Sequence, residues 1–348
     1  MNRRLLMIST DRNIFTEGSA VRARQIEYAK QWDEVHIVIF ETAQACRARG
    51  SREVVLAPNC WAYSTSSAFK LKYSFDAMKI GRVIVPGRGI TNITCQDASL
   101  TAMAGISLKK QFHIPLEIQV HEDLGSPKYA FRASNKLRRA LALSYLPKAD
   151  HIRVVSNKIK NFLVDSLKID AGRVEVRPIM IDTERIRNAP IIPGADLHKK
   201  YPQFEVIVLM AGRLEKEKNF ILGIRAWKEV VKKLPKAGLV ILGSGSEKDR
   251  LKKIAKELGL AGSSGSTVVF EDWIGSEVLI SYYKTADLFL NTSLFEGYGM
   301  TLVEATAAGC TIISTDVGVA REVGATIVDW TPTAVASGVI GAIGSTRL

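Results

Sequence analysis

The stretch "VIVLMAGRLEKEKNFILGIRAWKEVVKKL" (206–234) decides the fold class of this chain. It opens with a continuous apolar run, 206–210, which predicts a parallel strand buried on both faces. A charged loop follows. From Phe220 to Leu234 the apolar residues then recur with the period of an amphipathic helix. Strand, loop and helix in this order form the unit from which doubly wound α/β folds are built.

The same alternation extends over nearly the whole chain. A second amphipathic helix is expected at 251–258. The stretch 185–203 interrupts the alternation with three prolines and a glycine, and we interpret it as a linker. Strands are expected at 5–9, 35–40, 82–85, 116–120, 152–156, 173–177, 206–210, 239–242, 267–270, 287–291 and 311–315. The prediction is two Rossmann-like, doubly wound parallel-sheet domains, 1–184 and 204–348, facing across a cleft that holds the ligand.

The charge of the chain is unevenly distributed. Residues 1–200 carry 32 Lys and Arg against 19 Asp and Glu, whereas residues 201–348 carry 16 of each, so the formal net charge of +13 lies in the first half. Such asymmetry predicts an anionic partner for that half: nucleic acid, a membrane surface or a phosphorylated acceptor. The alternative is charge that serves solubility alone.

Cysteine and histidine patterns argue against a disulfide or metal framework. The four cysteines are scattered without a C-x-x-C pair, which favours buried free thiols in a reducing cytoplasm. The five histidines show no H-x-x-H or H-E-x-x-H spacing, so a zinc site is not expected. No stretch is long and apolar enough for a signal peptide or a membrane span. The expectation is a cytoplasmic protein, soluble or bound to a surface.

Two loops of the second half carry groups suited to a phosphate ligand. Arg213 and Lys218 follow a strand and precede a helix that Asn219 could cap, a setting that suits a diphosphate. The alternative is a solvated surface loop. Gly243 and Gly245 follow the next strand. They lack the third glycine of a dinucleotide fingerprint and instead indicate a tight turn lining a ligand cleft.

The segment "LFEGYGMTLVEATAAGC" (294–310) holds two glutamates around a glycine loop. Thr301 and Glu304 fit a capping box, which is one explanation for Glu304. The functional explanation covers the whole segment. Backbone N–H groups bared by the glycines approach an anionic or sugar ligand, and Glu296 and Glu304 accept hydroxyl pairs from a sugar or ribose.

Four segments resemble, in order and spacing, the nucleotide-sugar domain of retaining glycosyltransferases of family 4 (glycosyl transferases group 1), which have the GT-B fold. They are "AGRLEKEKN" (211–219), "ILGSGSEKDRL" (241–251), "ADLFLNTSLFEGYGMTLVEATAAGCTIISTDVG" (286–318) and "REV" (321–323). The E-x7-E element of that family falls on Glu296 and Glu304. Segments 17–22, 95–127 and 149–163 are similar to the acceptor domain of the same family.

The resemblance implies a role for each matched position. Arg213 and Lys218 neutralise the donor diphosphate, Glu296 faces the donor sugar and Glu304 binds the ribose hydroxyls. His121 lies close to the reacting sugar, although a turn histidine satisfied by backbone groups is the alternative. The remaining donor-binding positions are Gly18 in the loop closing over the phosphates, Asp123 of an H-x-D pattern, Gly243, Gly245, Trp273 and Ile274 near the base, and the loop of Gly297, Tyr298, Gly299, Met300 and Thr301.

The resemblance further implies transfer of a sugar from a nucleoside-diphosphate donor with retention at the anomeric carbon, without a metal or other cofactor. The family normally has a further helix after this point, whereas about 25 residues follow the last matched segment. The chain is therefore expected to be either truncated or unusual at its C-terminal end. Other enzyme classes of the same fold, epimerases or hydrolases of sugar nucleotides, and a non-catalytic sugar-nucleotide-binding subunit are the rival interpretations.

Basic and aromatic residues are interleaved in two stretches of the first half. Lysines in 68–79, and lysines and arginines in 126–150, alternate with aromatic and other apolar residues at helical spacing, which suits an anionic membrane surface; a helix with a solvated face is the alternative. A glycan or lipid-linked acceptor in envelope assembly follows as a hypothesis, with no nucleic acid expected. The candidate membrane or acceptor residues are Lys128, Arg132, Lys136, Arg138 and Arg139.

Overall fold

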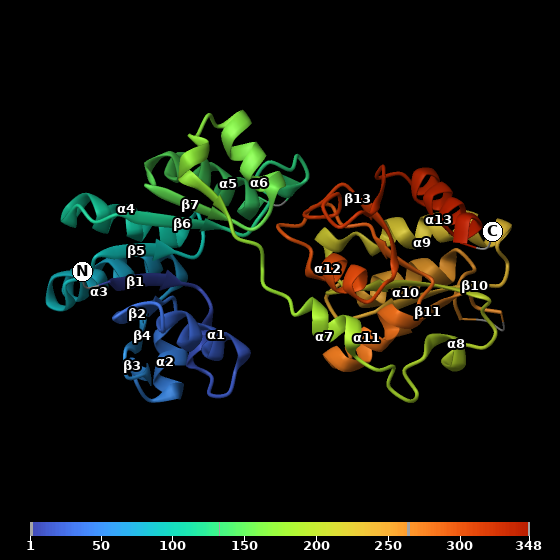
Figure 1. Cartoon of the computed structure of the whole chain (residues 1–348), viewed down its shortest axis with the longest axis horizontal. Coiled ribbons are helices and arrows are strands. Elements are labelled where there is room, and N and C mark those ends of the chain that lie inside the picture. The colour runs from blue at the N-terminus through green and yellow to red at the C-terminus, as the bar shows by residue number, and fades with distance from the viewer. Residues whose placement is uncertain (1–2, 132, 263–264, 347–348) are drawn as a thin grey trace. The chain divides into compact units, whose positions relative to one another are not determined.

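The computed structural model describes residues 3–131, 133–262 and 265–346. The chain forms two compact units, with the boundary between Arg177 and Pro178 (Figure 1). Each unit is one β-sheet covered by helices, and each is described by itself below. Among the described residues no helix is long and apolar enough to cross a bilayer.

The first unit holds an eight-stranded sheet in the order β3-β4-β2-β1-β5-β6-β7-β8. All neighbours are parallel except β3 and β4. The strands are β1 (Arg4–Ser9), β2 (Glu34–Ile39), β3 (Glu53–Ala57), β4 (Cys60–Ser64), β5 (Asn92–Cys95), β6 (Leu116–Val120), β7 (His151–Val154) and β8 (Val174–Val176). The helices are α1 (Ala20–Ala29), α2 (Ala43–Arg49), α3 (Tyr73–Arg88), α4 (Leu100–Phe112), α5 (Ala133–Tyr145) and α6 (Asn157–Asn161).

The second unit holds a six-stranded, all-parallel sheet in the order β11-β10-β9-β12-β13-β14. The strands are β9 (Val206–Ala211), β10 (Ala237–Leu242), β11 (Val268–Glu271), β12 (Leu288–Asn291), β13 (Thr311–Thr315) and β14 (Thr326–Val328). The helices are α7 (Thr183–Asn188), α8 (Leu197–Lys200), α9 (Phe220–Lys233), α10 (Lys248–Glu257), α11 (Ser276–Thr285), α12 (Met300–Ala307) and α13 (Pro332–Thr346).

Two hydrophobic cores, one on each face of the second sheet, explain the continuous apolar strands. Val208 and Met210 of β9 pack with Trp227 of α9 in one core, together with α10 and α13. Ile207 and Leu209, which alternate with them, pack in the other core with α8, α11 and α12. Because both faces of the strand are covered, every position of the strand is apolar. The predicted fold class, two doubly wound α/β domains, is therefore confirmed.

The expected strand at 82–85 is wrong, because these residues lie inside α3. Ile84 and Val85 are buried together with Ala77 and Met78, which is the spacing of one helical face. Three consecutive apolar residues, Val83 to Val85, do not distinguish a strand from a buried helix segment. The strand at this place in the sheet is β5, between β1 and β6. The hairpin of β3 and β4, and β14, were not predicted.

The stretch 185–203 packs on the second unit. Leu197 of α8 is fully buried, and its N–H donates to the Thr285 hydroxyl of α11 at 3.1 Å. The N–H of Ile192 donates in the same way to Ser281 at 3.0 Å. The stretch therefore belongs to the second compact unit, which begins at Pro178, ahead of the expected linker.

Candidate functional site

Two glycine-containing loops meet at the carboxyl ends of β9 and β10. These strands are neighbours in the sheet, so the loops that follow them are adjacent. A Cβ atom added at Gly243 would lie 1.9 Å from the carbonyl oxygen of Gly212, and one at Gly245 would lie 2.4 Å from that of Leu214. The Leu214 N–H donates to Ser244 O at 2.9 Å. The two glycines thus allow the loops to pack backbone against backbone, beside the predicted ligand site.

Lys218 and Glu296 form an ion pair that joins the loops after β9 and β12. Lys218 Nζ lies 2.5 Å from Glu296 Oε1, and the side chains are 18% and 13% exposed. The hydroxyl of Ser293 donates to the same carboxylate oxygen at 2.7 Å. The N–H of Leu294 donates to Glu217 O at 2.8 Å. Two residues assigned separate roles from the sequence, one toward the diphosphate and one toward the sugar, are therefore held in contact.

Arg213 is placed differently from Lys218, although both belong to one loop. Its side chain is 70% exposed and lies 3.6 Å from Glu217 Oε1. Asn219 adopts a left-handed conformation, φ 49°, at the N-cap of α9 and makes no side-chain cap bond. The loop therefore presents one solvated guanidinium and one half-buried ammonium group.

The capping box expected at the start of α12 is wrong. The helix begins at Met300, its N-cap is Gly299 with φ 94°, and Thr301 lies inside the first turn. Glu304 instead accepts a hydrogen bond from the Tyr283 hydroxyl at 3.3 Å. Glycine adopts this left-handed N-cap conformation without steric cost, and the helix starts two residues earlier than the sequence pattern implies.

The pKa of Glu304 is raised above its usual value of 4.5, because burial disfavours the charged carboxylate; the hydrogen bond from Tyr283 opposes this shift. A carboxyl whose pKa is higher in the folded than in the unfolded chain adds to the free energy of unfolding. The addition is complete at pH values below the pKa of the unfolded chain. That contribution is lost as the pH rises through the folded pKa. We therefore expect the stability of the chain, relative to Glu304→Gln, to fall as the pH rises from 4.5.

Urea unfolding of both proteins at several pH values between 4 and 7 tests this expectation. Glu257→Gln, on the exposed end of α10, is the matched control for the loss of a glutamate carboxylate. If the difference in unfolding free energy between Glu304→Gln and the unmodified chain does not change with pH, the effect of burial on Glu304 is contradicted.

The loop after β11 carries the two residues predicted to contact the base. Trp273 is 61% exposed, and Ile274 packs partly against the core shared with α11. Glu271, at the end of the strand, accepts hydrogen bonds from Lys200, Tyr201 and Tyr282 at 2.5–2.7 Å. Sequence reasoning missed this anchor, because Lys200 and Tyr201 come from the stretch interpreted as a linker.

In the first unit, His121 and Asp123 follow β6. His121 lines a hollow of about 260 Å³ together with Asp97, Ser99 and Arg138, among others. Asp123 is buried, and its Oδ1 accepts from the N–H groups of Gly125 and Ser126, both at 3.1 Å. Asp123 therefore shapes the turn behind His121.

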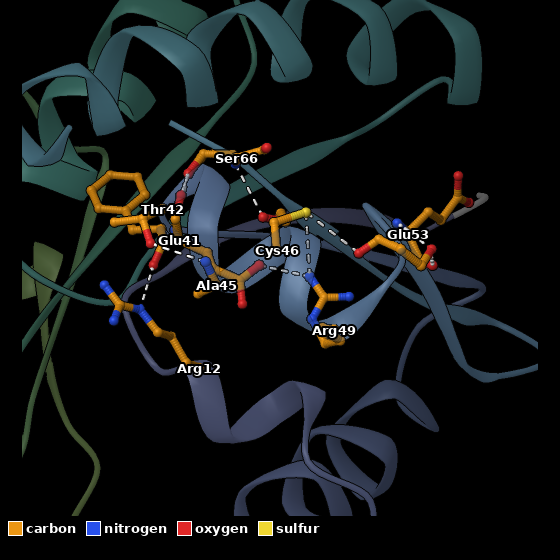
Figure 2. Close-up of polar contacts among 12 residues, drawn as sticks. Arg12, Glu41, Thr42, Ala45, Cys46, Arg49, Glu53 and Ser66 are labelled. Atoms are coloured by element: carbon orange, nitrogen blue, oxygen red, sulfur yellow. Dashed lines mark hydrogen bonds and ion pairs between the residues drawn. The ribbon is translucent and has the colours of Figure 1, made fainter. Parts of the chain in front are cut away.

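Gly18 lies in an exposed loop with φ 73°, directly before the Ser19 N-cap of α1. It is not among the residues that line the hollow. The preceding turn, η1 (Arg12–Phe15), is fastened to the end of β2: Arg12 Nε donates to Phe40 O at 3.1 Å (Figure 2). Arg49 of α2 pairs with the buried Glu41 at 2.6 Å (Figure 2). Its guanidinium also lies over the Phe15 ring. These contacts, which sequence reasoning missed, position the glycine loop.

Of the basic residues predicted to contact a membrane or acceptor, two make polar contacts with the loop after β6 and two are exposed. Arg138 lies 3.7 Å from Glu122 Oε1, and Arg139 Nε donates to Leu124 O at 2.8 Å, so both reach the loop that follows His121. Lys128 and Lys136 are exposed. Arg132 lies outside the described residues. All four cysteines are buried free thiols, as predicted.

Two family models match the chain. Residues 197–328 match "Glycosyl transferases group 1", and residues 27–185 match "Glycosyltransferase Family 4". The chain is 32% identical over 183 residues to N-acetylgalactosamine-N,N'-diacetylbacillosaminyl-diphospho-undecaprenol 4-alpha-N-acetylgalactosaminyltransferase of Campylobacter jejuni, covering 52% of this chain and 46% of that protein. It is 28% identical over 179 residues to D-inositol 3-phosphate glycosyltransferase of Streptomyces avermitilis, covering 49% and 38%. The chain thus spans half or less of the length of these relatives.

Solved structures share the fold over almost the whole chain. Sucrose-phosphate synthase from Thermosynechococcus elongatus superposes with a TM-score of 0.74 at 19% identity, covering 99% of this chain and 91% of that one. HepE from Anabaena, solved in complex with UDP, has a TM-score of 0.70 at 17% identity with the same coverage. These structures are GT-B glycosyltransferases, so the likeness shows the GT-B fold.

Proposed function

We propose, because this chain belongs to glycosyltransferase family 4, that it transfers a sugar with retention from a nucleoside diphosphate to a glycan or lipid-linked acceptor in envelope assembly. The observation that carries the proposal is the Lys218–Glu296 ion pair beside the glycine loop that opens α12. A cation suited to a phosphate and a carboxylate suited to sugar hydroxyls are held there in contact. The HepE structures, which contain UDP or UDP-glucose, support a donor of this class.

The second unit offers a group for each part of such a donor. Arg213 and Lys218 oppose the charge that grows on the leaving diphosphate, and they stabilise the transition state more than the ground state. Glu296 faces the sugar, whose anomeric carbon becomes oxocarbenium-like. Glu304 accepts the ribose hydroxyls, and the exposed Trp273 ring offers a surface for the base.

The charge on the diphosphate is met by these two side chains, so we infer that transfer needs no divalent cation. Thermal-shift titration with UDP, GDP, ADP and their sugar conjugates tests the donor site. One nucleotide should raise the melting temperature of the chain, and the shift should be lost in Arg213→Ala but kept in Arg225→Ala, an exposed arginine on α9. No shift with any nucleotide would refute the proposal.

A radiolabelled donor that shifts the melting temperature distinguishes transfer from the rival activities. Label passing to an acceptor at an unchanged rate in EDTA would support a metal-independent transferase. Release of free sugar at the full rate without an acceptor would instead indicate a hydrolase. Donor binding without any turnover would indicate a binding subunit.

We further propose that the first unit rests on an anionic membrane surface from the cytoplasmic side. Leu71 is 83% exposed, Phe69 54% and Phe75 52%, and the exposed Lys70 and Lys72 lie beside them. Exposed apolar side chains among lysines suit a headgroup layer, where each cation contributes about 1 kcal/mol.

Co-sedimentation with vesicles tests this membrane proposal. We expect binding to vesicles containing phosphatidylglycerol at low salt, and weaker binding by Leu71→Ser. Lys216→Ser, an exposed lysine of the second unit, is the control that should bind normally. Equal binding of neutral and anionic vesicles, or no binding to either, would contradict the proposal.

A further inference from the structure

A stripe of polar side chains leads along β6 to His121. Glu117, Gln119 and His121 occupy alternate positions of the chain and so share one face of the sheet. Thr94 of β5 lies opposite Glu117 in register. Gln119 is 4% exposed and Thr94 2%. Buried polar groups of this kind must satisfy one another, because unpaired they would each lower the stability of the fold.

The hydrogen bonds of the stripe fix the orientation of the Gln119 amide. The Thr94 hydroxyl donates to Glu117 Oε1 at 2.7 Å, so toward Gln119 it can only accept. Gln119 Nε2 lies 3.0 Å from that hydroxyl and 3.3 Å from Glu117 Oε1. Both neighbours are acceptors, so the NH₂ group must face them. The Gln119 carbonyl oxygen is thereby turned toward His121.

The amide in turn fixes the proton of the imidazole. Gln119 Oε1 lies 3.2 Å from His121 Nε2, and a carbonyl oxygen can only accept. His121 Nε2 must therefore carry the hydrogen. Surrounding protein atoms of the hollow, followed by the positive charge of Arg153, lower the pKa of His121 below 6.5, while Asp97 opposes this shift. At neutral pH the ring then has one proton, on Nε2, and Nδ1 is a hydrogen-bond acceptor.

We propose that Gln119, held by Glu117 and Thr94, is a positioning residue that keeps the proton of neutral His121 on Nε2. Nδ1 is thereby left to accept a hydrogen bond from a sugar hydroxyl bound in the hollow. The inference about the hydroxyl rests on the proposed function. The inference about the proton rests on the geometry of the first unit alone.

Nitrogen-15 NMR of the full chain with labelled histidine measures the proton directly, because protonated and unprotonated ring nitrogens differ widely in chemical shift. The signals of His121 are assigned by their loss in His121→Asn. We expect Nε2 to be of the protonated type at pH 7.5, and Gln119→Leu to give a mixture of tautomers. A proton on Nδ1 in the unmodified chain would overturn the proposal. So would an unchanged tautomer in a folded Gln119→Leu protein.

Gln119→Glu gives a second test that does not depend on the leucine variant folding. A carboxylate beside Nε2 favours the imidazolium form and should raise the pKa of His121. The variant leaves the other charged groups around the ring unchanged. They are Asp97 after β5, Glu122 after β6, Arg138 of α5 and Arg153 of β7. The acidic limb of the pH–rate profile should move about one pH unit upward, since only neutral His121 accepts through Nδ1.

Gln111→Glu, an exposed glutamine on α4, is the matched control and should leave the limb in place. An unmoved limb in Gln119→Glu would overturn the role of His121 toward the hydroxyl. If the chain transfers no sugar at all, the proposed function fails, while the NMR result still decides whether Gln119 places the proton.

Discussion

Lys218→Ala is expected to lower the rate of sugar transfer about 100- to 1,000-fold, the range found when one preorganised electrostatic group is removed from an active site. The ammonium group is positioned by Glu296 before the donor arrives, so its attraction for the leaving diphosphate costs no reorganisation. The substitution also leaves Glu296 without its cation in a largely buried position. The free energy of unfolding should therefore fall by about 3 kcal/mol.

The two effects of Lys218→Ala can be separated with a double variant. Lys218→Met combined with Glu296→Gln removes both charges of the pair, so it should recover most of the lost stability and none of the lost activity. Lys216→Ala, an exposed lysine of the same turn, is the matched control. Sugar-transfer assays measure the rate, and urea unfolding measures the free energy of unfolding. Transfer by Lys218→Met at nearly the unmodified rate would contradict a role in catalysis.

Gly243→Ala is expected to unfold or severely destabilise the second unit, by more than about 4 kcal/mol. Its Cβ atom would lie 1.9 Å from the Gly212 carbonyl oxygen, and a rotamer change cannot relieve the clash, because the Cβ is fixed to one backbone and the oxygen belongs to the other. The φ of 147° adds strain for any residue with a side chain. The loops after β9 and β10 would move apart, and Arg213, which lies in the loop after β9, would be displaced. The nucleotide-dependent thermal shift should then disappear.

Gly341→Ala is the matched control for this experiment. Gly341 lies in α13 on the same unit, is exposed, and has no atom within 4 Å of an added Cβ. Alanine there should raise the free energy of unfolding by up to about 1 kcal/mol, because it favours the helix. Calorimetric melting of both variants provides the measurement. A Gly243→Ala protein that melts within about 2 °C of the unmodified chain would show that the loops can move apart at little cost.

Which strands could be predicted depended on the length of the apolar run. The run at 206–210 is continuous and lies between loops, so the strand and its burial on both faces followed from the sequence. Residues 82–85 hold only three apolar residues, which follow Arg82, and the nearby Ala77 and Met78 supply a helical face. Asn92–Cys95 has only one aliphatic residue, so its place in the sheet left almost no local signal.

For the candidate site, the sequence by itself determined which residue types are present and which protein family their motifs resemble. Glu296, the glycines beside it and Lys218 are recognised from spacing within single loops, because short motifs need no knowledge of distant contacts. The same spacing suggested a capping box at Thr301, and there the local pattern was misleading. The left-handed Gly299 starts α12 earlier and releases Glu304 to the Tyr283 hydroxyl of α11.

Only the tertiary structure decided which of these residues act together. Lys218 and Glu296 are 78 positions apart, and they meet because β9 and β12 are neighbours in the parallel sheet, whose carboxyl ends share one edge. Thr94 likewise reaches Gln119 because β5 pairs with β6. The order of parallel strands is set by how the connecting helices pack over both faces. A hydrogen bond between two strand ends therefore leaves no trace in the sequence around either residue.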